Sequence, residues 1–437
     1  MTSSVTSGSA QESGGSVGAD ATEITPEPLP RLELVDGLTT VIDTESALAA
    51  TIERLAAGDG PIAIDAERAS GYRYGQRAYL VQLRRAGAGT SLIDPTAFED
   101  LTELAEVLGE SEWILHAASQ DLPCLAEIGL TPRSGLFDTE LAGRLLGLPR
   151  VGLAALVEQL LGQSLAKEHS AADWSTRPLP EPWLHYAALD VEPLVELRDA
   201  LDQLLRAADK RQWAAEEFDW IAHAPPASPR VDPWRRTSGM HRVRAPRGVA
   251  AVRALWYARD EIARKRDTAP GRILADAAVV EAALAMPVDA DAMQSLPAFR
   301  GRGARRYLST WVRTIAAVRA LPDSALPPVS VPGDGPPPPR VWPDRDPVAA
   351  ARLRRSRSGL GSLAESLSLP VENLIPPDAV RRVAWKPPDP ATSEAIENSL
   401  RTLGAREWQI ALAVPILTEA MVADVDPPAA TEAVTGE

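Results

Sequence analysis

Cysteine and histidine are nearly absent from this 437-residue chain, which contains one cysteine, Cys124, and five histidines. A single cysteine excludes an intramolecular disulfide and fits a reducing compartment. So few histidines argue against a histidine-rich zinc site. Long apolar runs are also missing, because no segment reaches the roughly 20 consecutive apolar residues of a membrane-spanning helix. We therefore expect a cytoplasmic protein that does not enter a membrane.

Positive charge is scarce as well. The chain has 45 lysine and arginine residues against 60 aspartate and glutamate residues, a net charge of −15. The deficit is uneven, because the segment from Arg230 to Arg319 has 18 basic against 8 acidic residues, a local excess of ten positive charges. A basic stretch of this size is typical of a surface that binds phosphate. The alternative is a set of helices whose arginines simply face solvent.

Four carboxylates are present at informative positions. Asp65 and Glu67 end an apolar run, and because side chains alternate along a strand, both point to the same face. Asp121 follows a second apolar run, and Tyr186 and Asp190 share one face of a predicted helix. Each motif alone is more often structural, but four converging carboxylates would repel one another without cations. Oxygen-only ligands suit Mg²⁺ or Mn²⁺.

In this order the motifs resemble those of ribonuclease D, a 3′→5′ exonuclease in the tyrosine-bearing branch of the DEDD superfamily. The resemblance runs from about Leu32 to Trp385 and includes three further segments, Arg77-Ala78-Tyr79-Leu80-Val81-Gln82-Leu83, Phe137-Asp138-Thr139-Glu140-Leu141-Ala142 and residues 167–179. It departs where the family usually has Asp-Thr-Glu followed by Phe and a basic residue. Here the sequence is Asp65-Ala66-Glu67-Arg68-Ala69-Ser70, so the RNA contacts near Arg68 are left open.

The resemblance implies roles for these residues. Two divalent ions, Mg²⁺ or Mn²⁺, would be bridged by Asp65, with Glu67 and Asp190 completing one site and Asp121 holding the second, largely through water. Tyr186 would orient the attacking water. The expected substrate is RNA with a free 3′ end, either single-stranded or the 3′ tail of a transfer-RNA precursor. Nucleoside 5′-monophosphates would be released in transfer-RNA processing or RNA turnover, and a monomer is expected.

Three other polar residues lie close to these motifs in the sequence. Gln82 and His116 are candidates for contact with nucleic acid, although a buried histidine held by hydrogen bonds at a strand end is the competing interpretation of His116. Asp138 precedes an apparent helix start, so we interpret it as a helix N-cap rather than a metal ligand.

The expected fold class is α/β, with a ribonuclease-H-like 3′→5′ exonuclease domain followed by two all-α modules, one HRDC and one HRDC-like. Predicted strands are 61–65, 78–84, 90–94, 113–116 and one near 135–137. Predicted helices are 45–57, 97–108, 120–127, 139–147, 152–162 and 182–215, the last kinked at Pro193. Composition divides the chain into a disordered tail (1–30), the exonuclease domain (31–222), a linker (223–243), the HRDC domain (244–324), a Pro-rich linker (325–343), the HRDC-like module (344–423) and a second disordered tail (424–437).

The first helical module supplies the basic candidates for RNA contact, namely Arg264, Lys265, Arg266, Arg300, Arg302, Arg305 and Arg306. The second module has no candidate catalytic set and is expected to complete the scaffold. We also expect the catalytic domain to fold without everything after about Ala224. Two alternative functions are a DNA-directed 3′→5′ exonuclease and a non-catalytic RNA-binding protein that kept the fold. Loss of any of the four acids would have favoured the second alternative, and none is missing.

Overall fold

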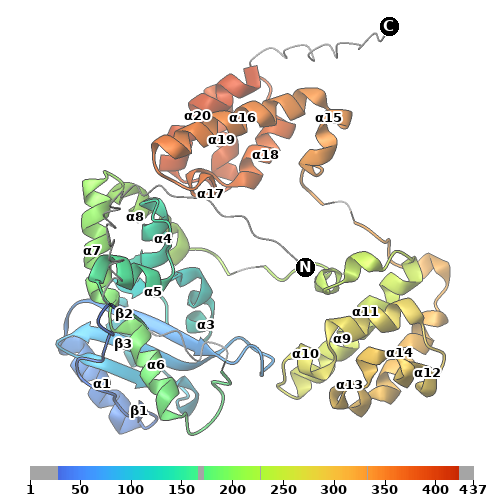
Figure 1. The fold of residues 1–437 in the computed structure, drawn as a ribbon, viewed down its shortest axis with the longest axis horizontal. Helices are drawn as coiled ribbons and strands as arrows, with labels where there is room; N and C mark the ends of the chain where they lie inside the picture. Colours follow the sequence, from blue (N-terminus) through green and yellow to red (C-terminus); the bar gives the residue numbers. More distant parts are fainter. Residues whose placement is uncertain (1–27, 166–171, 227, 332, 423–437) are drawn as a thin grey trace, which may run out of the picture.

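The structure is a computed structural model that describes residues 28–165, 172–226, 228–331 and 333–422. The second predicted tail, nearly all of the first and the family-like segment 167–171 therefore lie outside the described residues. Figure 1 shows a mixed α/β domain that contains the β-sheet, together with two helical modules formed by α9 to α14 and by α15 to α20. Within the described residues, no helix has both the length and the apolar character needed to cross a membrane.

The sheet of the first domain has six strands in the order β1-β4-β3-β2-β5-β6. Their bounds are Val41–Ile42, Asp59–Arg68, Ala78–Ala86, Gly89–Ile93, Trp113–Leu115 and Leu136–Asp138 for β1 to β6. Strand β2 runs antiparallel to β3 and parallel to β5. The predicted mixed sheet and its five predicted strands are confirmed. The two-residue strand β1 was missed because it is too short to show a periodic pattern.

The helices of this domain are α1 Glu45–Ala57, α2 Thr102–Gly109, α3 Leu122–Glu127, α4 Thr139–Leu145, α5 Leu153–Leu156, α6 Glu181–Val191, α7 Leu194–Ala207 and α8 Arg211–Ala222. Two sequence predictions are wrong in detail. The segment 182–215 is not one kinked helix. Helix α6 ends at Val191, and Pro193, which has no N–H group to continue α6, is the N-cap residue of α7. Helix α2 begins only at Thr102, whose backbone N–H is bonded to the Asp100 carboxylate.

The first helical module contains α9 Pro246–Lys265, α10 Pro270–Ile273, α11 Asp276–Ala285, α12 Ala290–Ser295, α13 Arg302–Arg306 and α14 Leu308–Arg319. Its apolar core includes the fully buried side chains of Phe299 and Trp311. Trp234, which falls in the predicted linker, is buried in the same core. The packed module therefore begins earlier in the chain than its helical periodicity does.

The second helical module contains α15 Trp342–Arg345, α16 Pro347–Ser366, α17 Val371–Leu374, α18 Pro377–Trp385, α19 Ser393–Thr402 and α20 Glu407–Val422. Its buried residues form one continuous apolar core with those of the α/β domain. At the junction, Trp408 stacks on Trp213 of α8 with ring centroids 4.9 Å apart. The Arg406 guanidinium also pairs with the buried Glu217 carboxylate. The expectation that the catalytic domain folds without the segments after Ala224 is therefore not supported, because deletion would expose this core and leave a buried charge unpaired.

Replacing Trp408 with alanine tests this shared core. The Trp408 side chain is 4% exposed and donates its indole N–H to Glu217, so we expect a loss of about 3–5 kcal/mol in the free energy of unfolding. Urea unfolding measures the loss, and hydrogen exchange should show faster exchange in α8 as well as in α20. Trp220→Ala is the control, because that side chain is 47% exposed and should cost less. Unchanged exchange in α8 would mean that the two parts fold independently.

Candidate active site

Strand β2 carries the first two carboxylates. Ile62 and Ile64 are fully buried in the core and fix the register of β2, which places Asp65 opposite Gln82 and Glu67 opposite Leu80 of β3. A slip of one residue would exchange the two faces of the strand, so burial of the isoleucines determines where the carboxylates point. Asp65 and Glu67 lie on one face of β2, as the alternation of side chains predicts.

Asp121 is positioned by a turn that follows β5. Ala117 adopts a left-handed conformation with φ of 59°, and its N–H is bonded to the Asp138 carboxylate at 3.1 Å. The same carboxylate accepts a bond of 2.9 Å from Ala118 N–H and caps α4 through Leu141 N–H at 3.1 Å. The interpretation of Asp138 as a helix N-cap is confirmed. Asp138 also fixes the turn that leads into Asp121.

Helix α6 carries Tyr186 and Asp190. Ala187 and Ala188, between them in the sequence, are buried against the sheet, so the small residues allow the helix to approach the strands closely. The Tyr186 hydroxyl donates a hydrogen bond to the Asp190 carboxylate. This pair therefore faces the same side of the helix, as the spacing of four residues predicts.

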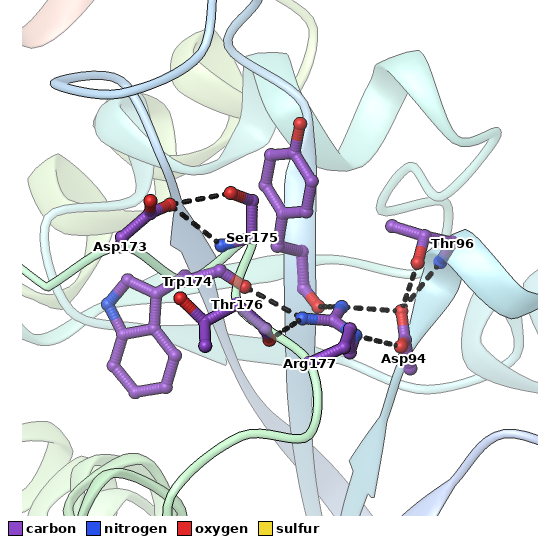
Figure 2. Close-up of polar contacts among 8 residues, drawn as sticks. Asp94, Thr96, Asp173, Trp174, Ser175, Thr176 and Arg177 are labelled. Atoms are coloured by element: carbon purple, nitrogen blue, oxygen red, sulfur yellow. Dashed lines mark hydrogen bonds and ion pairs between the residues drawn. The ribbon is translucent and has the colours of Figure 1, made fainter.

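Arg177 ties the segment before α6 to the sheet, as Figure 2 shows. Its guanidinium donates two hydrogen bonds, of 2.5 and 2.8 Å, to the Asp94 carboxylate and a third to the Tyr79 carbonyl at 2.8 Å. It also donates to the carbonyls of Trp174 and Thr176, each at 2.8 Å. Sequence analysis did not identify this positioning residue, although it lies in a family-like segment. An arginine that bonds to five acceptors fixes the entry into α6.

All four carboxylates and Tyr186 line one cavity of about 390 Å³. Asp65, Glu67 and Asp190 have carboxylate oxygens within 4.8 Å of one another, whereas Asp121 lies outside this group of three. We call Asp65, Glu67, Asp121 and Asp190 the acidic cluster. The complete lining of the cavity is Asp65, Ala66, Glu67, Arg68, His116, Ala117, Gln120, Asp121, Glu140, Gly152, Tyr186 and Asp190.

Comparison with known proteins assigns this arrangement to a family. A family model described as 3′-5′ exonuclease matches residues 39–206, one described as HRDC domain matches residues 249–315, and one described as 3′ to 5′ exonuclease C-terminal domain matches residues 335–421. Ribonuclease D of Gluconacetobacter diazotrophicus is 32% identical over 296 residues, which cover 66% of this chain and 74% of that protein. The chain belongs to the ribonuclease D family.

Solved structures agree with the assignment. A protein from Bifidobacterium adolescentis is 39% identical, with a TM-score of 0.83 over 90% of this chain and 100% of that one. Escherichia coli RNase D is 25% identical, with a TM-score of 0.61 over 83% of this chain and 98% of that one. As a member of the ribonuclease D family, the chain is a 3′→5′ exoribonuclease. Neither the DNA-directed nor the non-catalytic alternative is favoured.

Burial and mutual repulsion disfavour the charged forms of the acidic cluster. Burial is the largest cause in each case and raises the pKa of Asp65 to about 6. It also raises the pKa of Glu67, Asp121 and Asp190, and the neighbouring carboxylates raise these three further. Protons or cations must therefore neutralise the cavity. A buried set of oxygen ligands with three carboxylates in close contact fits divalent cations.

Two residues predicted to contact nucleic acid lie in different settings. Gln82 is completely buried and does not line the cavity, so it offers no surface to RNA, and this prediction is corrected. Its position in an internal strand covered by α6 explains the burial. His116 lines the cavity, with Nδ1 2.9 Å from the Thr139 hydroxyl, and burial lowers its pKa to about 4. It is therefore a neutral, hydrogen-bonded strand-end histidine.

Of the seven basic residues predicted to contact RNA in the first helical module, only some line a common cavity. Lys265, Arg266 and Arg306 line a cavity of about 700 Å³ in this module, which we call the basic cavity. The predicted residues Arg264, Arg300, Arg302 and Arg305 lie outside its lining. Arg272, which was not predicted, is part of it and stacks 4.0 Å over the Tyr72 ring of the catalytic domain. Within the described residues, Arg266 and Arg306 form no ion pair, so their charge is uncompensated.

The raised carboxylate pKa values predict how stability depends on pH in the presence of a chelator. The folded protein binds more protons than the unfolded chain, whose carboxylates have pKa values of about 4, so the cluster should lower the free energy of unfolding as pH rises from about 4 to about 8. Calorimetry should give a steeper fall for the wild type than for Asp190→Asn. Mn²⁺ should restore most stability at the higher pH. If the free energy of unfolding fell equally steeply with pH in the two proteins, the acidic cluster would not be the source of the pH dependence.

Proposed function

We propose that the chain removes 3′-terminal nucleotides one at a time from RNA with a free 3′ end, and releases nucleoside 5′-monophosphates with the help of two Mg²⁺ or Mn²⁺ ions. The observation that carries the proposal is the acidic cluster, which gathers in one cavity beside Tyr186. Single strands and the 3′ tails of transfer-RNA precursors are the proposed substrates, and transfer-RNA processing or RNA turnover is the proposed setting. We propose that the protein acts as a cytoplasmic monomer.

We assign the ligands to two sites. Asp65, Glu67 and Asp190 would hold one cation, and Asp65 with Asp121 would hold the second, because Asp121 lies apart from the close group of three. When bound, the two cations supply positive charge that stabilises the attacking and leaving oxygens of the phosphodiester. The cavity of about 390 Å³ lies at the lower end of the range for small-ligand sites, which suits one nucleotide rather than a duplex.

Tyr186 is assigned to orientation of the attacking water. Burial and the nearby carboxylates raise the pKa of its hydroxyl, so the group keeps its proton. A protonated phenol can donate to one oxygen and accept from another, which suits it to holding a water in line with the phosphorus atom. The hydrogen bond to Asp190 places the Tyr186 hydroxyl beside the carboxylates of Asp65, Glu67 and Asp190.

The basic cavity is proposed to bind RNA phosphates upstream of the 3′ end. Arg266 and Arg306 have no acidic partner among the described residues, and anions compensate such charges. The cavity also adjoins the catalytic domain, since Arg272 donates to the Gly71 carbonyl at 2.7 Å. Gly71 lies four residues after Glu67 in the sequence, so the loop that leaves the catalytic strand also contacts the basic cavity.

Asp190→Asn and Tyr186→Phe should separate metal binding from water positioning. The neutral amide is a poor partner for a dication, so Asp190→Asn should lose Mn²⁺ affinity and nearly all activity. Tyr186→Phe should keep Mn²⁺ and RNA affinity but lose kcat by roughly 10²- to 10⁴-fold. Single-turnover cleavage of end-labelled single-stranded RNA, with binding measured in Ca²⁺, checks both variants.

Tyr257→Phe is the matched control, because Tyr257 is half exposed on α9 and should leave both binding and turnover unchanged. If Tyr186→Phe cleaved RNA at the wild-type rate, the Tyr186 hydroxyl would have no role in catalysis and the side chain would serve only in packing. Wild-type activity in a chelator would contradict the use of metal ions altogether.

Charge removal at the basic cavity should change the salt dependence of RNA binding. Each phosphate contact that is lost lowers the slope of log affinity against log salt by about 0.7 for single strands, so the double variant Arg266→Gln/Arg306→Gln should lose about 1.4. Fluorescence anisotropy at several salt concentrations measures this slope. The control is Arg313→Gln/Arg319→Gln, which makes the same charge change on exposed positions of α14. Equal slopes for the two double variants would mean that the basic cavity is an ordinary solvated surface.

A further inference from the structure

Among the described residues, Arg68 is the only lysine or arginine that lines the catalytic cavity. One of its terminal nitrogens lies 3.7 Å from an Asp121 carboxylate oxygen, and its side chain is 29% exposed. A cation beside a proposed metal ligand needs a physical explanation.

Arg68 is the last residue of β2, at the point where the pairing of β2 with β3 becomes irregular. Glu67 pairs with Leu80, but the next residue, Arg68, pairs with Ala78, so the register of β2 against β3 shifts between them. In a regular strand Arg68 would point to the face opposite Glu67. The shift leaves Tyr79 of β3 as the extra residue, and at this end of β2 both Arg68 and Glu67 line the catalytic cavity.

The guanidinium has unused hydrogen-bonding capacity at this position. Its contact with Asp121 is an ion pair at 3.7 Å, longer than a hydrogen bond, and within the described part of the chain Arg68 donates no side-chain hydrogen bond. Arginine has five N–H donors in a planar fork that matches two oxygens of a phosphate. The partly exposed Arg68 guanidinium can therefore donate hydrogen bonds to an anion that enters the acidic cavity together with cations.

We propose that Arg68 binds the phosphate of the 3′-terminal nucleotide and releases Asp121 to the second cation when the substrate enters. The proposal rests on the proposed function. If one cation is bound by Asp65, Glu67 and Asp190 and the other by Asp65 and Asp121, the phosphate must lie between these two cations. Arg68 stands at the Asp121 side of that position. Before the substrate arrives, its charge offsets part of the repulsion on Asp121 and competes with the second cation for this carboxylate.

Two binding measurements on Arg68→Gln test the proposal. Isothermal titration with adenosine 5′-monophosphate in Ca²⁺ should show an affinity at least about tenfold weaker than in the wild type, because a charge-assisted phosphate contact is lost. Titration with Mn²⁺ in the absence of nucleotide should show binding about three- to tenfold tighter, because a positive charge beside Asp121 is removed. Arg68→Lys should recover part of the nucleotide affinity, since it keeps the charge without the planar fork.

Arg77→Gln is the matched control, because Arg77 is exposed, lies over the Tyr79 ring and does not line the cavity. Adenosine, which lacks the phosphate, should bind Arg68→Gln and the wild type equally. Unchanged monophosphate affinity in Arg68→Gln, or an equal loss in Arg77→Gln, would overturn the proposal. A wild-type protein that cleaves RNA with Mn²⁺ but does not bind the monophosphate would overturn the Arg68 role alone, whereas a protein without metal-dependent cleavage would overturn the proposed function.

Discussion

The repulsion among the four carboxylates of the acidic cluster opposes folding of the catalytic domain unless protons or cations neutralise it. Three separate sets of contacts hold the carboxylates in place against this repulsion. The buried isoleucines of β2 fix one pair of carboxylates, Asp138 fixes the turn before the third, and Arg177 anchors the segment that leads to the fourth. Each set is built from groups that do not touch the expected metals, so the site stays assembled while its charge changes.

The uneven charge of the chain follows from the same constraint. The catalytic cavity must be acidic to hold cations, so attraction for the RNA backbone has to come from elsewhere, and the basic cavity supplies it. A loop between β2 and β3 joins the two regions, since the Tyr74 hydroxyl donates to the Asp260 carboxylate at 3.0 to 3.1 Å and Arg272 donates to Gly71. The net charge of −15 is thus compatible with an enzyme that binds RNA.

Much of the catalytic cavity could be predicted from the sequence, because strand alternation, helix periodicity and the order of the motifs are local properties. The ion pair between Arg68 and Asp121 could not, since it joins two residues that lie far apart in the sequence. The burial of Gln82 depends on which helix covers the sheet, and the contribution of Arg272 depends on packing between domains. The sequence likewise indicated a second helical module but not what it packs against, so the core shared through Trp408 was unforeseen.

Anomalous diffraction from crystals soaked in Mn²⁺ and a nucleoside 5′-monophosphate would show whether two cations bind to the acidic cluster. We expect two Mn²⁺ peaks in the catalytic cavity, one among Asp65, Glu67 and Asp190 and the other between Asp65 and Asp121, about 3.5–4 Å apart. We expect the nucleotide phosphate between the two peaks. A cavity without Mn²⁺ at saturating concentration, or with a single ion that Asp121 does not approach, would contradict the proposed two-cation site.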